Sequence, residues 1–306
     1  PFGSIVNWDL IPINAVARLA VEPGSNPIFG VNALGGALVA RTKTGQDSPG
    51  ASLSILGGSF GRWAVSGQAG AADAATHTDY FLAANYDTQS GYRDYSPSTV
   101  QQLYGKVRWH GAQDHTLLEL SGAYADTDLH GTQSLPQEMI STPKAAYTWP
   151  DHIDNRMGMV NLKASQWLND AGQLSGELYY RRSDARNLNS NAQLDDGCFS
   201  ADGSLATTSS GAYKCANQAP GGTAVNSVTG ANALALGYGR WTSSINSSLV
   251  QSSTLQQTVG VSGQWRDSGN LMGLSNAFIL GGALDQSHIR YQQDTSLARL
   301  INRETV

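Results

Sequence analysis

The feature that most constrains the fold of this chain is an alternation of apolar and polar side chains with a period of two. Between residues 100 and 111, one set of alternate positions holds Leu103, Gly105, Val107 and Trp109, and the other holds Tyr104, Lys106, Arg108 and His110. The segments 172–186 and 254–266 show the same pattern. A period of two places successive side chains on opposite faces of a β-strand, whereas an amphipathic helix needs a period near 3.6. The chain is therefore predicted to be all-β.

The connections between the predicted strands alternate between short and long. We predict about nine strands, at residues 51–57, 62–71, 78–88, 100–111, 114–125, 158–169, 172–186, 254–266 and 275–290. Short turns at 111–113, 169–171 and 267–270 alternate with long connections at 89–99, 126–157 and 187–253. The exception is the first connection, 58–61, which is short although the alternation calls for a long one there. Loops above about 15 residues are uncommon in compact soluble domains. Outer-membrane barrels combine short periplasmic turns with long outer loops, so the pattern predicts a transmembrane antiparallel β-barrel.

Composition agrees with a membrane-spanning sheet. Charged residues make up 14% of the chain, and 34 of its 306 residues are glycine, against about 25% and 7% in ordinary soluble domains. No apolar run reaches the roughly 18 to 20 residues that a membrane helix needs, so any crossing must be by strands, in which only every second residue faces lipid. The net charge of −5 provides no basic surface for nucleic acid, which we exclude as a partner.

A sheet inside a membrane must close on itself, because its backbone groups find no other partners there. Nine strands are too few for a large barrel, since outer-membrane barrels with an occupied lumen have about 22 strands. The first ten residues also lack the basic stretch and apolar core of a signal peptide. We therefore expect a fragment with somewhat under half of a barrel. Aromatic residues near predicted strand ends are expected in an interfacial girdle, with ordinary packing within the sheet as the alternative: Tyr86, Trp109, Tyr124, Tyr180 and Trp265.

A glycine-rich motif precedes the first predicted barrel strand. Arg18 begins a short strand, a turn follows, and an aromatic-glycine pair leads into a run of small residues that closes at Lys43. The residues that carry the motif are Arg18, Glu22, Gly24, Phe29, Gly30, Asn32, Gly35 and Gly36. Gly24, Gly35 and Gly36 permit positive φ angles or close backbone approach. In order and spacing, the motif resembles the end of the plug domain of TonB-dependent outer-membrane receptors.

This resemblance implies a domain organisation and a function. Residues 1–45 are expected to form the C-terminal part of a plug domain, and residues 46–306 the N-terminal part of the barrel. The protein is expected in the outer membrane of a Gram-negative bacterium, surrounded by outer-membrane lipid, where it imports a ferric siderophore or a similar scarce nutrient. The TonB energy-transducing complex would act through a plug segment absent from this sequence. No cofactor, metal site or catalysed reaction is expected.

Two other classes of protein use similar strands. A passive porin or structural barrel would lack the plug motif, and a soluble all-β carbohydrate-binding protein would have a packed core and no lipid-facing band. The run from Gly57 to Gly61 formally matches the G-x-S-x-G pattern of hydrolases, but that pattern works at a strand-to-helix turn. Because a second strand is predicted next, we interpret the run as a tight turn and predict no enzyme activity.

Several polar and aromatic residues are candidates for a site. Aromatic and cationic groups in the predicted outer loops suit planar, anionic ligands; these are Tyr92, Arg93, Tyr95, Tyr147, Trp149 and Arg186, although each is also compatible with simple exposure. Asp126, Asp128 and His130 have the donor types of a cation site, but a solvated strand end is favoured. Cys198 and Cys215 lie in the longest loop, where a disulfide is predicted and two free thiols are the alternative.

Overall fold

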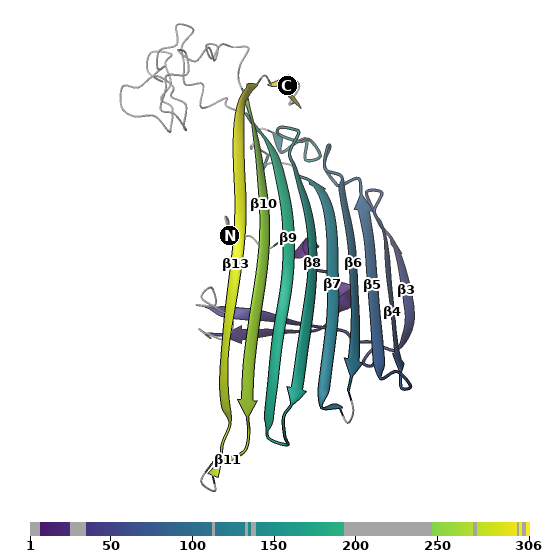
Figure 1. Cartoon of the computed structure of the whole chain (residues 1–306). Helices are drawn as coiled ribbons and strands as arrows, with labels where there is room; N and C mark the ends of the chain where they lie inside the picture. The colour runs from purple at the N-terminus through teal and green to yellow at the C-terminus, as the bar shows by residue number, and fades with distance from the viewer. Residues whose placement is uncertain are drawn as a thin grey trace, which may run out of the picture.

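The computed structural model describes residues 7–24, 35–111, 114–131, 134–135, 139–192, 247–271, 274–298, 300–301 and 304–306. Within these residues, nine strands form one curved antiparallel sheet (Figure 1). They are β3 (Gly50–Gly57), β4 (Trp63–Asp73), β5 (Thr78–Gln89), β6 (Ser98–His110), β7 (Thr116–His130), β8 (His152–Trp167), β9 (Gly172–Ala192), β10 (Ser247–Asp267) and β13 (Phe278–Ala298). Neighbours in the sheet follow chain order, with β3 and β13 at the edges. The prediction of an all-β chain with about nine antiparallel strands is confirmed.

The strands are longer than predicted at the ends that lead into the long connections. β7 continues to His130 rather than residue 125, β8 begins at His152 rather than 158, and β9 continues to Ala192 rather than 186. The apolar–polar alternation stops where both faces become polar, but backbone pairing between these strands continues without a break. Side-chain alternation therefore marks the apolar part of each strand and misses its polar extension.

Register fixes which side chains share a face. Across β5 to β10, one row contains Leu82, Gly105, Gly122, Val160, Tyr180 and Val259. This face, called the outward face, lies opposite the N-terminal segment, and its large apolar side chains are about half exposed, at 53% for Leu82 and 54% for Val160. Trp109 and Trp265 also lie on it, at one end of the apolar band, and Tyr124 and Tyr180 lie at the other. The sheet thus has an exposed apolar band where a soluble protein would have a buried one.

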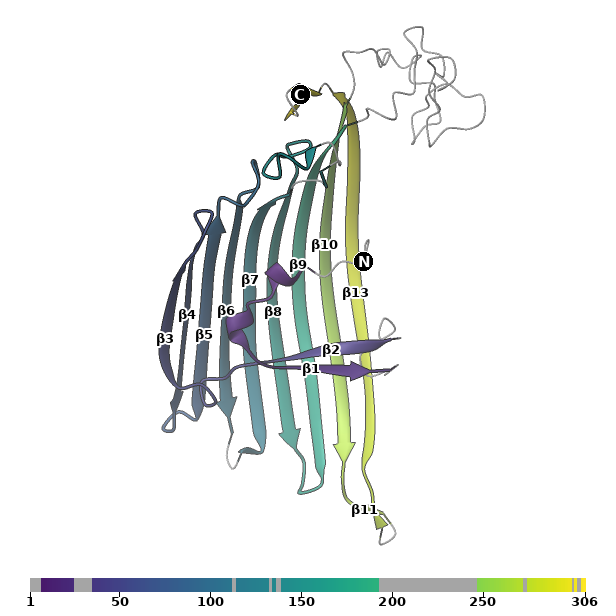
Figure 2. The same ribbon diagram turned by 180° about the vertical axis from the view of Figure 1, so that it is seen from behind.

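The N-terminal segment lies across the other face, called the inner face (Figure 2). It consists of two short 3₁₀ helices, η1 (Trp8–Leu10) and η2 (Ile13–Ala15), and a hairpin of β1 (Val16–Pro23) and β2 (Gly36–Thr42). Gly24 and Gly36 have φ angles of +93° and +144°. A Cβ at Gly36 would lie 2.7 Å from the carbonyl oxygen of Glu22, so this end of the hairpin requires glycine.

Four two-residue strands complete the described structure. β11 (Asn270–Leu271) and β12 (Leu274–Ser275) pair in the turn between β10 and β13, and β14 (Leu300–Ile301) pairs with β15 (Glu304–Thr305). In the described parts of the chain, no helix has the length and apolar character needed to cross a membrane.

Candidate functional site

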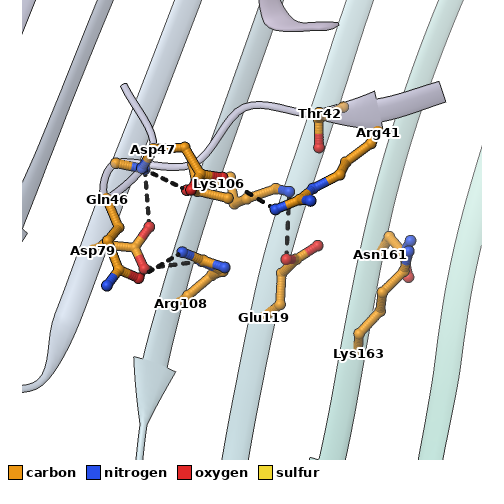
Figure 3. A network of polar contacts seen from close by, with 12 residues as sticks. Arg41, Thr42, Gln46, Asp47, Asp79, Lys106, Arg108, Glu119, Asn161 and Lys163 are labelled. Atoms are coloured by element: carbon orange, nitrogen blue, oxygen red, sulfur yellow. Dashed lines mark hydrogen bonds and ion pairs between the residues drawn. The ribbon is translucent and has the colours of Figure 1, made fainter. Parts of the chain in front are cut away.

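A buried carboxylate fastens the end of the N-terminal segment to the sheet. Asp79 on β5 is 2% exposed and lies on the inner face (Figure 3). It accepts a hydrogen bond from the backbone N–H of Gly45 at 2.9 Å, and its other oxygen lies 2.8 Å from Nε of Arg108 and 3.2 Å from Nε2 of His110. Burying a charged carboxylate is costly unless it is paired and hydrogen-bonded. These contacts meet that condition and join the N-terminal segment to β5 and β6.

From Asp79, charges alternate in sign along one inward row of five neighbouring strands. The row contains Asp79, Arg108, Glu119, Lys163 and Glu177, on β5 to β9 respectively. Lys106 adds a buried ion pair, with its Nζ 3.3 Å from Oε2 of Glu119 and the two side chains 5% and 15% exposed. Opposite charges on facing positions of paired strands stabilise a sheet. The inner wall is therefore a polar surface whose charges are matched strand by strand.

Neutral contacts hold the rest of the N-terminal segment. Gln102 on β6 donates through Nε2 to the carbonyl oxygens of Asp9 and Ile11, at 2.7 and 3.0 Å, and the hydroxyl of Tyr104 donates to Thr42 Oγ1 at 2.9 Å. Packing at the junction is close, because a Cβ at Gly45 would meet backbone oxygens of the sheet at 2.2 and 2.3 Å. These contacts hold the start of the segment, at Asp9 and Ile11, and the end of its hairpin, at Thr42, against the wall.

At the other end of the sheet, aromatic pairs join successive outer connections. Phe60, between β3 and β4, meets Tyr92 edge to face at 5.4 Å between ring centroids. Tyr95 stacks on Trp149, with centroids 4.3 Å apart and planes 12° apart. These contacts link the connections 58–62, 90–97 and 131–151 into one cluster. Five of the six predicted ligand residues, namely Tyr92, Arg93, Tyr95, Tyr147 and Trp149, belong to it.

Arg186 does not join this cluster. It was expected in an outer loop, but β9 continues past it, and its register with Asp154 and Ser253 places it on the outward face. Its Nε lies 3.5 Å from Oδ1 of Asp184 on the same strand. Because the apolar–polar alternation ends near this point, it could not predict that the strand extends further.

Small polar residues of the outer end escaped prediction. Thr148 is fully buried and donates to the carbonyl oxygen of Ser190 at 2.8 Å, while Asp151 accepts from the backbone N–H of Ser190 at 2.5 Å. Thr305 donates its N–H to the carbonyl oxygen of Trp149 at 2.8 Å. Serine and threonine are common in any loop, so only the folded structure identifies these as the residues that fix the connection 131–151.

The run from Gly57 to Gly61 forms the predicted tight turn. Phe60 and Gly61 have φ angles of +59° and +66°, and a strand follows in place of the helix that a hydrolase site needs. Arg62 closes the turn by donating to Asp87 at 2.7 Å. This hydrogen bond and the negative charge of Asp87 raise the pKa of Arg62 above its ordinary value.

Some predicted residues lie outside the described parts of the chain. These are Phe29, Gly30 and Asn32 of the glycine-rich motif, and both cysteines, Cys198 and Cys215. The tip of the motif and the disulfide therefore remain predictions. Among the residues that are described, no group of three or more His, Cys, Asp or Glu side chains is arranged to hold a metal ion.

The curved antiparallel sheet, with an exposed apolar band on one face and a polar inner wall on the other, defines a class of fold: part of a large β-barrel. Comparison with solved structures agrees, and the similar structures are TonB-dependent siderophore receptors. The ferripyoverdine receptor of Pseudomonas aeruginosa, bound to ferripyoverdine, matches with a TM-score of 0.61 and 10% identity over 92% of this chain and 34% of its own. The ferric citrate transporter FecA, unliganded, matches with a TM-score of 0.59 and 8% identity over 93% and 34%.

The siderophore receptor PiuA from Acinetobacter baumannii matches with a TM-score of 0.52 and 11% identity, over 94% of this chain and 52% of its own. The chain thus spans about a third to a half of the length of these receptors. No protein-family model and no curated protein matches it. The predicted resemblance to TonB-dependent receptors is confirmed at the level of the fold.

Proposed function

We propose that this chain is part of a TonB-dependent receptor in the outer membrane of a Gram-negative bacterium, and that the receptor imports a ferric siderophore or a similar iron complex. The observation that carries the proposal is the N-terminal segment fastened to the inner wall through Asp79. A passive porin or structural barrel would lack the plug motif that this segment carries between Arg18 and Lys43. A soluble carbohydrate-binding protein would bury the apolar band that this sheet exposes.

The same contacts support a domain boundary near residue 45. Up to Thr42 the chain forms a hairpin paired only with itself, and from Gly50 it forms the sheet. Between them, Thr44 is buried and Gly45 is pressed against the wall. We assign residues 1–45 to the C-terminal part of a plug and residues 46–306 to the N-terminal part of the barrel.

The outer cluster supports a ligand site at the mouth of the barrel. Tyr92 and Tyr95 are 49% and 54% exposed, and Arg93 lies between them in the sequence. Exposed aromatic rings beside a guanidinium suit planar, anionic ligands such as iron chelates. Tyr147 and Trp149, in the connection that stacks on Tyr95, would form the other side of this site.

Uptake of radioactive iron tests the proposal. A strain lacking the gene, grown under iron limitation, would be supplied with individual ferric siderophores, with and without an uncoupler of the proton-motive force. The proposal expects uptake of at least one complex to require both the gene and the proton-motive force. Gene-dependent uptake that survives the uncoupler would instead indicate a passive pore, and unchanged iron uptake across the panel would refute iron import.

A further inference from the structure

Two histidines and two aspartates face each other at the outer ends of β7 and β8. In the register of these strands, His130 lies opposite His152 and Asp128 lies opposite Asp154. All four belong to the same face as Tyr124, the outward face, and lie four (Asp128, Asp154) and six (His130, His152) residues beyond the Tyr124–Gly158 rung at the end of the apolar band. The cluster comes from two adjacent strands and is complete within the described residues.

The geometry of the pair resembles the outer shell of a metal site. The two imidazole rings are stacked, with centroids 5.2 Å apart and planes 21° apart. Nε2 of His130 lies 3.0 Å from Oδ1 of Asp128, and Nε2 of His152 lies 3.2 Å from Oδ2 of Asp154. A carboxylate that accepts a hydrogen bond from one ring nitrogen fixes the tautomer and directs the lone pair of the other nitrogen towards a metal. Each ring therefore has an Nδ1 available for coordination.

The carboxylates give a second reason for a cation here. One rung closer to the membrane, Asp126 is neutralised by Arg156, whose Nε lies 2.9 Å away on the facing strand. At the next rung, Asp128 and Asp154 face each other directly, and like charges on facing positions destabilise a sheet. Arg186, on the far side of Asp154, contacts a carboxylate of its own strand instead. This rung therefore holds two facing carboxylates, and an additional positive charge beside them would stabilise it.

We propose that His130 and His152 bind one borderline divalent cation, such as Cu²⁺, Zn²⁺ or Ni²⁺, through their Nδ1 atoms. Asp128 and Asp154 act as hydrogen-bonded outer partners, and water completes the coordination. Metal–nitrogen distances of about 2.0–2.1 Å put the two nitrogens within about 4 Å of each other, so binding requires the two rings to turn out of the nearly parallel stack seen here. Only two protein ligands contact the metal, unlike a closed structural zinc site with four.

Copper titration with paramagnetic resonance tests the site. The full-length protein, purified in detergent and stripped with a chelator, would be titrated with Cu²⁺. We expect one saturable equivalent whose hyperfine pattern reports two imidazole nitrogens. His130→Gln and His152→Gln should each abolish the two-nitrogen signal. Asp128→Asn should keep the signal but weaken the affinity by about 10- to 100-fold, as loss of an outer partner does.

A matched control separates this site from general copper binding. His288 on β13 also faces outward, but it lies opposite Gln257 and lacks a second histidine. His288→Gln should leave the two-nitrogen signal and its affinity unchanged. Absence of that signal in the wild-type protein, or its survival in either His130→Gln or His152→Gln, would overturn the proposal. Because the cluster faces away from the N-terminal segment, the outcome is independent of whether the protein imports iron.

Discussion

An arginine placed on either side of one strand tests the assignment of the two faces. Val261 on β10 points outward and is 50% exposed, and it lies near the middle of the apolar band between Val259 and Trp265. Ser262, the next residue, points inward, where it lines a hollow of about 710 Å³ together with Glu177. In register, Glu177 is the direct neighbour of Ser262. The two positions therefore differ in environment while sharing a strand and a depth.

The expected costs of the two substitutions differ by a wide margin. Arginine on the lipid face of a barrel costs about 2–4 kcal/mol at the bilayer midplane and about 0–1 kcal/mol near its edge. Val261→Arg should therefore shift the folding equilibrium by about 30- to 700-fold. Gln257→Arg also faces outward, but it lies four residues or about 14 Å further along the strand, beyond the band, so its cost should be near zero. Ser262→Arg should cost little, because its guanidinium reaches Glu177.

Urea titration of the full-length protein folded into lipid vesicles, followed by tryptophan fluorescence, measures these free energies. We expect the order of stability to be wild type, Gln257→Arg and Ser262→Arg close together, with Val261→Arg well below. If Ser262→Arg were the more damaging of the two adjacent substitutions, the outward and inner faces would be assigned the wrong way round.

Two further substitutions probe the inner wall. Glu119→Gln removes the charged partner of Lys106, whose side chain is 5% exposed. Because a buried charge is then left unpaired, the free energy of unfolding should fall by about 3–5 kcal/mol in the same titration. The double substitution Lys106→Met and Glu119→Leu, which removes both charges, should recover most of this loss. Gly45→Ala places a Cβ 2.2 and 2.3 Å from the carbonyl oxygens of Ala71 and Tyr80. The N-terminal segment should therefore separate from the wall, and protease should cleave it faster than in the wild type. A cleavage rate equal to that of the wild type would argue against the close packing at Gly45.

The sequence predicts the strands well because every second residue follows one rule, the rule that lipid would impose on the outward face of the proposed barrel. Trp109 and Trp265 were expected on the apolar face near strand ends, and they lie there, 42% and 40% exposed. Within each strand, this alternation predicts which residues lie on the apolar face and which lie on the polar face. The rule holds only inside the band, however, so it could not show that β7 continues to His130.

Pairing between strands is what the sequence could not predict. Alternation places Arg108 on the polar face of its strand, but only register sets it against Asp79 and Glu119. In the same way, His130 was visible as a possible cation ligand, while its partner His152 stands 22 positions later at the start of a strand that the alternation placed six residues further on. A site formed by facing residues of two strands can be predicted only if the pairing register of the strands is known. Where a long connection joins the two strands, the sequence does not show that register.

One physical rule accounts for where the few charges of this protein lie. A charge away from water must be paired, and a charge facing lipid is rarely tolerated. From Leu118 to Tyr124 on β7, the outward positions are therefore uncharged, whereas Glu119, inward on the same strand and beneath the N-terminal segment, is paired with Lys106. Beyond the band water returns, and facing carboxylates such as those of Asp128 and Asp154 become tolerable. At the rung nearest the band the counter-charge of Asp126 is Arg156, and two rungs further out, as proposed above, a metal ion bound by His130 and His152 would supply it.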